Sequence, residues 1–269
     1  MSVEDISVAI KEKEEYNKSL TDYVSLLQGR SEIKYPDKLS ELASFRDYDV
    51  QLLKDQGIFY VGEAAELLLP QYLNRLVEFG VISPNNNKPI YHNRWVMPIK
   101  DSDGLVQNLV GYSPDSDERY IYGTARYYRR ADTLYGLENI NEAYQCGYAI
   151  LTEGITDAIC LRNLGYKVAF GRCGTRSSDY VVDLLNRCKY GVIRIPDRDN
   201  AGLRALKDWK FNRHVTLFVN LQYKDVDQMC RNDETCKEIV KQYIDHSIGW
   251  LKQSEHRGIR CGCEEYTML

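Results

Sequence analysis

The stretch from residue 149 to residue 202 restricts the fold of this chain more than any other part of its sequence. It opens with Ala-Ile-Leu-Thr-Glu153 and closes with Val-Ile-Arg-Ile-Pro-Asp197-Arg-Asp199-Asn-Ala-Gly. Each half is a short apolar run, typical of a buried strand, that ends in acidic residues and is followed by a helical pattern. Ligands of an open parallel sheet bind outside the carboxyl ends of its strands. We therefore expect these carboxylates to meet at one edge of a sheet.

The same alternation of strands and helices continues on both sides of this stretch. Alternating elements with short connections predict an α/β fold, with a mostly parallel sheet flanked by helices. We expect strands at 148–152, 167–171, 190–195 and 215–219, and helices at 156–164, 178–187 and 201–210.

The segments before and after this α/β region show other sequence patterns. Helical spacing and capping signals predict helices at 3–28, 40–57 and 70–80, and turn residues between two apolar runs predict a hairpin with strands at 94–99 and 105–112. An amphipathic helix and a loosely ordered, cysteine-bearing tail are expected at the end of the chain. Four regions result: a helical region at 1–90, a basic α+β region at 91–146, the α/β region at 147–230, and a helix and tail at 231–269.

Asp197 and Asp199 are the sharpest candidates for chemistry. Two carboxylates so close together repel each other, and both ionise only if a cation holds them. Mg²⁺ suits such a site because it takes oxygen ligands from a few carboxylates and from substrate phosphates. The plain alternative is a surface turn in which Asp199 caps a helix. The metal site is favoured because further acids are predicted at strand ends of the same sheet: Glu153, Asp225 and Asp227.

Two neighbours of these acids have open roles. Asp157 is expected one turn into a helix, where an acid interacts well with the helix dipole or could support the site from behind. Lys224 could pair with Asp225 or contact a phosphate. Glu153 itself could be a metal ligand or a general base.

A basic, tyrosine-rich segment precedes the α/β region. Residues 119–130 hold four arginines and four tyrosines and no acid. Arginines of this kind bind phosphates and tyrosines stack on bases, although a tyrosine-rich hairpin strand with solvated arginines has the same composition. Arg176 is a possible extension of this patch. The expected nucleic-acid or nucleotide contacts are Arg94, Arg119, Tyr120, Arg126, Arg129, Arg130, Arg172 and Lys224.

Composition limits the class of protein and the cellular compartment that can be expected. The net charge of −4 excludes a globally basic nucleic-acid binder but allows a local basic patch. The eight cysteines contain no Cys-x-x-Cys pair, so no zinc site is expected. The sequence shows neither a secretory signal nor an apolar run that could cross a membrane, so we expect a cytoplasmic protein with reduced cysteines and no membrane partner.

The acidic motifs resemble those of the TOPRIM domain, which is shared by bacterial-type primases, type IA and II topoisomerases and some nucleases. The matching residues are Glu153-Gly154, Asp197-x-Asp199-x-Ala201-Gly202 and Lys224-Asp225-x-Asp227. Arg94-x-x-x-Pro98-Ile99, the Asp-x-Asp-Gly104 turn and Leu134-Tyr-Gly-Leu137 resemble the preceding half of the DnaG-type primase catalytic core. The resemblance covers about residues 40 to 230, and the short chain suggests a bacteriophage-encoded protein acting in the host cytoplasm.

The resemblance implies an RNA primase. Mg²⁺ or Mn²⁺ held by Glu153, Asp197, Asp199, Asp225 and Asp227 would position nucleotide phosphates, with Glu153, Asp197 and Asp199 as the catalytic set. The implied partners are single-stranded DNA template, NTPs and a replicative helicase or another replisome protein. By its place in the motif, Arg119 stands where the family has a template- or NTP-guiding lysine, and so does Arg130.

The chain also departs from the family pattern. Gly111-Tyr-Ser replaces a Gly-Gly-Arg. We expect neither the family's zinc ribbon nor its helicase-binding domain, so template choice and helicase coupling would depend on partner chains or be lost. A TOPRIM nuclease acting on DNA or RNA is the alternative activity, and a binding module without turnover is the alternative of another class. A topoisomerase is disfavoured because there is no room for a strand-cleavage domain.

Overall fold

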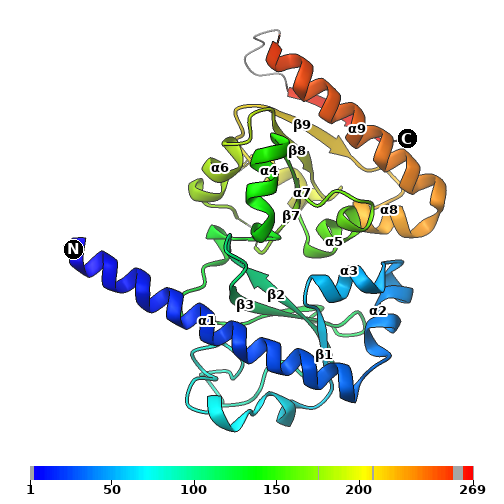
Figure 1. The fold of residues 1–269 in the computed structure, drawn as a ribbon. Coiled ribbons are helices and arrows are strands. Elements are labelled where there is room, and N and C mark those ends of the chain that lie inside the picture. Colours follow the sequence, from blue (N-terminus) through cyan, green and yellow to red (C-terminus); the bar gives the residue numbers. More distant parts are fainter. Residues whose placement is uncertain (1–2, 175, 208, 257–262, 269) are drawn as a thin grey trace. The chain divides into compact units, whose positions relative to one another are not determined.

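The computed structural model describes residues 3–174, 176–207, 209–256 and 263–268. The chain forms two compact units, Met1–Tyr128 and Arg129–Leu269. Each unit has its own sheet and its own apolar core (Figure 1). Among the described residues, no helix is both long enough and apolar enough to cross a membrane.

The first unit is built on an antiparallel sheet whose spatial order follows the sequence. The predicted hairpin is confirmed, with its two long strands paired around the turn at residues 101–104. The strands are β1 (Phe59–Val61), β2 (Arg94–Lys100), β3 (Val106–Tyr112) and β4 (Tyr120–Tyr122).

Helix α1 (Val3–Lys34) packs on this sheet as one continuous helix. Its buried residues recur at helical spacing and join the core of the unit; they are Tyr16, Leu20, Tyr23, Val24 and Leu27. The predicted helical segment at 3–28, which would end before Gly29, is too short. A Cβ on Gly29 would meet nothing within 4 Å, so this glycine costs only helix propensity, and packing on both sides of it keeps the helix intact.

Two other helix predictions in the first unit are wrong in detail. The segment 40–57 forms two helices, α2 (Lys38–Arg46) and α3 (Val50–Asp55), because Asp47 between them adopts a left-handed backbone with φ of 57°. The segment 70–80 forms only the short 3₁₀ turn η2 (Pro70–Tyr72) followed by turns. Its apolar residues do not share one helical face: Leu73 is 55% exposed, whereas Leu76 is fully buried.

A row of aromatic rings crosses the sheet of the first unit in register. Tyr60, Trp95, Tyr112 and Tyr120 are direct neighbours on adjacent strands, with ring centres 5.4, 6.4 and 5.1 Å apart. The indole N–H of Trp95 donates to the Lys38 carbonyl of α2. Cross-strand aromatic pairs of this kind stabilise a sheet.

The second unit contains the predicted α/β fold, which is confirmed. Its sheet has the order β10-β9-β8-β6-β7-β5, and only β5 runs antiparallel to its neighbour. The four predicted strands differ from the observed ones by at most two residues at either end. The strands are β5 (Leu134–Tyr135), β6 (Tyr148–Thr152), β7 (Ala169–Arg172), β8 (Gly191–Ile195), β9 (His214–Phe218) and β10 (Cys263–Thr267).

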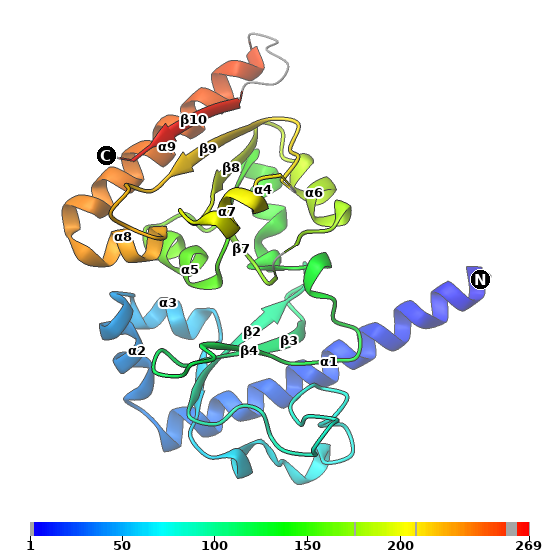
Figure 2. The same ribbon diagram turned by 180° about the vertical axis from the view of Figure 1, so that it is seen from behind.

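Helices cover both faces of this sheet, as Figures 1 and 2 show. One face packs against α4 (Ile140–Cys146), α6 (Asp179–Asn186) and α7 (Asn200–Ala205), whose apolar residues share a core with alternate residues of β6. The other face packs against α5 (Ile155–Asn163), α8 (Val226–Asn232) and α9 (Glu234–His256). Both faces are therefore buried, as the continuous apolar strand sequences require.

The ends of the second unit differ from expectation in two ways. Residues 129–146, predicted to belong to the basic region, join this unit because β5 pairs with β7 and α4 packs on β6. The tail was expected to be loosely ordered, but β10 pairs in parallel with β9 along five residues. Residues 257–262 of that tail lie outside the described residues. As a functional division, the four regions stay a prediction.

Candidate active site

The carboxyl ends of β6 and β8 bring the first two predicted acids together. These strands are parallel neighbours in which Thr152 lies opposite Ile195, so Glu153 and Asp197 leave the sheet at the same edge. The Asp197 N–H donates to Glu153 Oε2 over 3.3 Å. A Cβ on Gly202 would lie 2.8 Å from Glu153 Oε2 and 2.1 Å from the Asp197 carbonyl oxygen, so only glycine permits this approach.

Asp199 caps α7 and faces the same group. One of its carboxylate oxygens, Oδ1, accepts the N–H groups of Ala201 and Gly202 at 2.8 and 2.9 Å. The other, Oδ2, lies 3.8 Å from the Lys224 ammonium, which is 3.2 Å from Asp197 Oδ2. The cap and the charged site are therefore both present: one oxygen serves the helix and the other is available to a cation.

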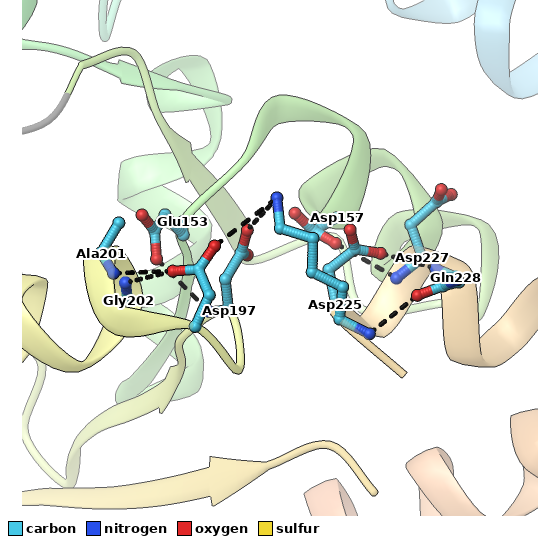
Figure 3. A network of polar contacts seen from close by, with 10 residues as sticks. Glu153, Asp157, Asp197, Ala201, Gly202, Asp225, Asp227 and Gln228 are labelled. Carbon is cyan, nitrogen blue, oxygen red and sulfur yellow. Dashed lines mark hydrogen bonds and ion pairs between the residues drawn. The ribbon is translucent and has the colours of Figure 1, made fainter. Parts of the chain in front are cut away.

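A second acidic group lies beside the first (Figure 3). Asp225 caps α8 by accepting the Gln228 N–H at 2.7 Å. Asp227 is only 1% exposed and pairs with Arg231 at 3.0 Å. Its backbone N–H donates to Asp157 Oδ1 at 3.1 Å. The structure thus places Asp157, which the sequence left between two roles, within the acidic cluster.

Burial and mutual repulsion oppose ionisation of this cluster. Burial and, after it, the Glu153 carboxylate raise the pKa of Asp197 to about 6, although the Lys224 ammonium acts in the opposite direction. Burial also raises the pKa of Glu153, against the Asp197 N–H and the Arg172 guanidinium. The pKa of Asp157 lies well above its usual range because of burial and the charges of Asp225 and Asp197.

For Asp199 and Lys224, in contrast, the surroundings favour the charged form. The N–H groups of Gly202 and Ala201 hold the pKa of Asp199 below its usual value, despite some burial. Partial burial disfavours the charged form of Lys224, but the carboxylates of Asp197 and Asp199 outweigh it and raise the pKa of the ammonium. The site therefore holds one acid that ionises readily next to acids that need a cation.

The donor set suits a hard divalent cation. Among the described residues, no three His, Cys, Asp or Glu side chains converge closely enough to enclose a metal ion. However, all donors in the cluster are carboxylate oxygens, and the Lys224 ammonium lies against two of them. Burial first, and neighbouring carboxylates second, raise the pKa of Asp157 and of Asp197. Glu153, Asp197, Asp199 and Asp225 would hold Mg²⁺ or Mn²⁺ with substrate oxygens completing the shell.

The basic residues predicted as contacts in the first unit differ in how accessible their side chains are. The Arg94 guanidinium is buried and donates to the Glu118 carbonyl at 3.0 Å and to Ser116 Oγ at 3.0 Å, so it ties a loop to β2. Arg119 is exposed and Tyr120 is half-buried. The side chain of Arg126 is 58% exposed and lies 3.4 Å from Glu78. Of the three arginines, Arg119 and Arg126 are open to a ligand.

In the second unit, Arg172 acts on the acids in addition to Lys224. It is buried, its guanidinium lies over the Trp209 ring at 5.4 Å, and it acts electrostatically on Glu153. Arg129 is 82% exposed and lies 3.4 Å from Asp132. Arg130 is exposed and its side chain packs against Gly174 in the loop after β7.

A cavity of about 610 Å³ opens beside Glu153. It lies between the start of α6 and α7. Three of its basic residues were not predicted as contacts, although their spacing in the segment after Asp199 was a usable signal: Arg204, Lys207 and Lys210 recur every three residues.

Comparison with known proteins relates this geometry to one family. The chain is 27% identical to the DNA primase of Thermotoga maritima over 173 residues, which are 60% of this chain and 30% of that protein. It is 27% identical to the DNA primase of Aquifex aeolicus over 179 residues, which are 62% of this chain and 36% of that protein. The chain thus spans about a third of the length of these curated relatives. No protein-family model matches it.

Solved structures agree on the fold. The zinc-binding and RNA polymerase domains of the Aquifex aeolicus primase superpose with a TM-score of 0.74 and 24% identity, covering 87% of this chain and 62% of that one. A DnaG primase catalytic domain bound to single-stranded DNA gives 0.70 and 19%, covering 85% and 82%. The chain is a relative of the DnaG-type DNA primases. Its two units together have the fold of the DnaG catalytic core, so the predicted resemblance is confirmed.

Proposed function

We propose that this chain is the catalytic core of a DNA primase that synthesises short RNA primers on single-stranded DNA. The observation that carries the proposal is the edge of the second sheet, where Glu153, Asp197 and Asp199 meet next to a second acidic group in a chain related to DNA primases. The chemistry would be nucleotidyl transfer, in which a 3′-hydroxyl attacks the α-phosphate of an NTP and pyrophosphate leaves.

The acids of the cluster would hold the cofactor that this reaction needs. When bound, Mg²⁺ or Mn²⁺ stabilises charge on the attacking and leaving oxygens. Glu153 and Asp197 approach from the strand ends, while Asp199 and Asp225 are fixed by the helices that they cap. Because each cap immobilises one carboxylate oxygen, it directs the other toward the ligand.

Basic residues of the two units would guide the substrates. Lys224 lies against Asp197 and Asp199 and would turn to a nucleotide phosphate once those carboxylates hold a divalent cation. Arg172 supports Glu153 from the interior. The exposed Arg119, Arg126 and Arg130 would contact the template backbone, with Tyr120 and Arg129 as further contacts. Arg94 has a structural role here, since its guanidinium is occupied by the 113–119 loop.

DNA and a replisome protein are the expected partners. A solved DnaG catalytic domain binds single-stranded DNA, and a relative from Mycobacterium tuberculosis was solved with double-stranded DNA. We extend template binding to this chain on the basis of the shared fold. Coupling to a replicative helicase stays a proposal of the same kind.

Primer synthesis tests the proposal. Purified protein is incubated with single-stranded DNA, labelled NTPs and Mg²⁺ or Mn²⁺, and the products are sized. We expect RNA oligomers from the wild type and a loss of at least about 10²-fold with Asp197→Ala, because a metal ligand contributes several kcal/mol. Asp22→Ala, which removes an exposed carboxylate from α1, is the matched control and should retain activity.

Other outcomes would identify the rival functions. Shortening of a labelled strand without new RNA would reveal a TOPRIM nuclease that uses the same carboxylates. Binding of DNA that is independent of the metal, with no turnover and no effect of Asp197→Ala, would reveal a binding module. Either outcome overturns the primase proposal.

A further inference from the structure

Two adjoining cavities lie in the first unit, where the last turns of α1 meet β1 (Figure 1). The larger has a volume of about 300 Å³ and the smaller about 220 Å³. Both are lined by Ser31, Tyr35 and Tyr60, so together they form one groove. None of the lining residues belongs to the candidate active site, and the proposed reaction does not use this groove.

The larger cavity is mainly apolar and reaches the core of the unit. Leu27 and Val61 line it, and both belong to the buried core. Ile33 also lines it, although this side chain is 86% exposed. The rings of Tyr35 and Tyr60 add aromatic surface. A cavity of this size and lining suits one bulky apolar side chain, the kind of anchor that contributes most of the affinity at many interfaces.

The tyrosine ring between the two cavities is held in place by its surroundings. Tyr35 Oη donates to Glu66 Oε1 at 2.5 Å, and the Gly62 N–H donates to Glu66 Oε2 at 3.1 Å. A Cβ on Gly62 would lie 2.1 Å from Tyr35 Oη, so a larger residue there would displace the ring. The Tyr60 ring stands at 82° to that of Tyr35, with centres 5.2 Å apart. The groove is therefore formed before a ligand arrives, which lowers the entropic cost of binding.

The lining of the groove carries an excess of positive charge. Four basic side chains line the two cavities, against two acidic ones. Lys34 pairs with Glu66, and Lys38 pairs with a glutamate outside the groove, so both ammonium groups are neutralised. Arg30 and Lys54 are exposed, and the part of the chain that the structure describes gives neither an ion pair. In a chain of net charge −4, these two cations favour an acidic ligand.

The positions of the two cations indicate a peptide. Arg30 lines the larger cavity and Lys54 the smaller one, so an extended segment that crosses both cavities would meet one cation in each. Between them it would place an apolar side chain against Leu27 and Val61. A nucleic-acid strand matches less well, because its phosphates need a row of cations rather than an apolar cavity.

We infer that this groove docks an acidic peptide segment of a partner protein, with a bulky apolar side chain in the larger cavity and carboxylates on Arg30 and Lys54. The apolar anchor supplies most of the affinity, and the charge-assisted hydrogen bonds of the two cations orient the segment. The inference does not depend on the proposed function, because peptide binding needs neither nucleotide nor metal.

The test measures the fluorescence anisotropy of a labelled acidic decapeptide with one central phenylalanine. A second peptide has serine in place of the phenylalanine. The groove variant of the full chain combines Arg30→Gln, Ile33→Ser and Lys54→Gln, all at exposed positions. The wild type should bind the phenylalanine peptide at least about tenfold more tightly than the serine peptide, and the groove variant should lose a similar factor for the phenylalanine peptide.

A matched control removes the same kinds of side chain elsewhere on α1. It combines Ile10→Ser, Lys11→Gln and Lys13→Gln, which are exposed and do not line the groove, and it should bind the peptide like the wild type. Circular dichroism checks that both variants fold, and Arg30→Gln alone replaces the groove variant if it does not.

Several outcomes would overturn the inference. Equal binding of the two peptides would show simple charge attraction, and equal losses in the groove and control variants would place the peptide elsewhere. Absence of peptide binding to the wild type is equally decisive. Displacement of the peptide by single-stranded DNA at lower concentration than by unlabelled peptide would identify a nucleic-acid site instead. Failure of primer synthesis would overturn the proposed function and leave the peptide result unaffected.

Discussion

Asp197-Arg-Asp199 and Asp225-Val-Asp227 have the same spacing in the sequence but opposite environments in the second unit. In each pair one aspartate caps a helix: Asp199 caps α7 and Asp225 caps α8. In the first pair the capping residue comes second, so Asp197 remains in the loop after β8, partly exposed and facing Lys224. In the second pair the capping residue comes first, so Asp227 falls within the first turn of its helix.

This difference decides what each aspartate can do. Asp227 is buried and its charge is balanced by Arg231 four residues later, which is a structural arrangement. Asp197 has a pKa of about 6 because burial and the Glu153 carboxylate outweigh the Lys224 ammonium. A divalent cation bound to this carboxylate would favour its ionised form. The position of an acid relative to the first residue of a helix therefore matters more than the spacing between acids.

The strongest test of this contrast is the pH dependence of the metal-free protein. Burial raises the pKa of Asp197 from 3.8 to about 6, so between these values the folded state binds more protons than the unfolded state. The free energy of unfolding should therefore fall as the pH rises through this window, by at most about 3 kcal/mol from this residue. Thermal unfolding in a chelator should show this slope in the wild type and a shallower slope in Asp197→Asn.

Magnesium gives the control for that experiment. At pH 7 added Mg²⁺ should stabilise the wild type and stabilise Asp197→Asn much less, because binding to the folded state alone raises its stability. Since Glu153 and Asp157 shift in the same direction as Asp197, the difference between wild type and variant is the informative quantity. Identical slopes in the two proteins would contradict the assignment of the raised pKa to Asp197.

A smaller effect is expected from the buried member of the second pair. Asp227→Ala leaves Arg231 without its carboxylate and should lower the free energy of unfolding by about 2 kcal/mol, less than for a fully buried pair because the Arg231 side chain is 30% exposed. Chemical denaturation of the second unit measures it. Asp225→Asn, which preserves the cap, is the matched control and should change stability by only a few tenths of a kcal/mol.

The smallest effect concerns the two caps. Asp199→Ala and Asp225→Ala should each lower the free energy of unfolding by about 1 kcal/mol. The asparagine variants should keep most of the stability that the cap contributes, because asparagine also caps helices well. Asp199→Asn sharpens the comparison, because it keeps the cap but weakens a metal ligand. We expect it to unfold like the wild type while losing primer synthesis, and equal losses of stability and activity would contradict that separation.

The sequence predicted the second unit well because its strands are buried on both faces. Continuous apolar runs such as 148–152 and 191–195 have few alternatives, and the acids that follow them mark the edge of the sheet. The first unit was harder to predict from the sequence. Its helix predictions failed where a single backbone conformation or packing decided the outcome, as at Asp47 and Gly29.

The candidate site was predicted in part. Glu153, Asp197 and Asp199 lie at the same edge of the sheet because strand order and helix capping both follow from local sequence. The central place of Asp157 did not follow, since an acid in the first turn of a helix is usually explained by the helix dipole. The burial of Arg94 was equally hidden, because it depends on a loop that folds back from residues 113–119.

Arg172 and Trp209 give the second unit a built-in optical probe. The guanidinium lies 5.4 Å from the centre of the fully buried indole and acts on Glu153. Indole emission responds to the electric field of nearby charges, so a cation that arrives at Glu153 should change the emission of Trp209. With Trp95 and Trp250 replaced by phenylalanine, the fluorescence of Trp209 would then show whether a cation is bound at the acidic edge of the sheet.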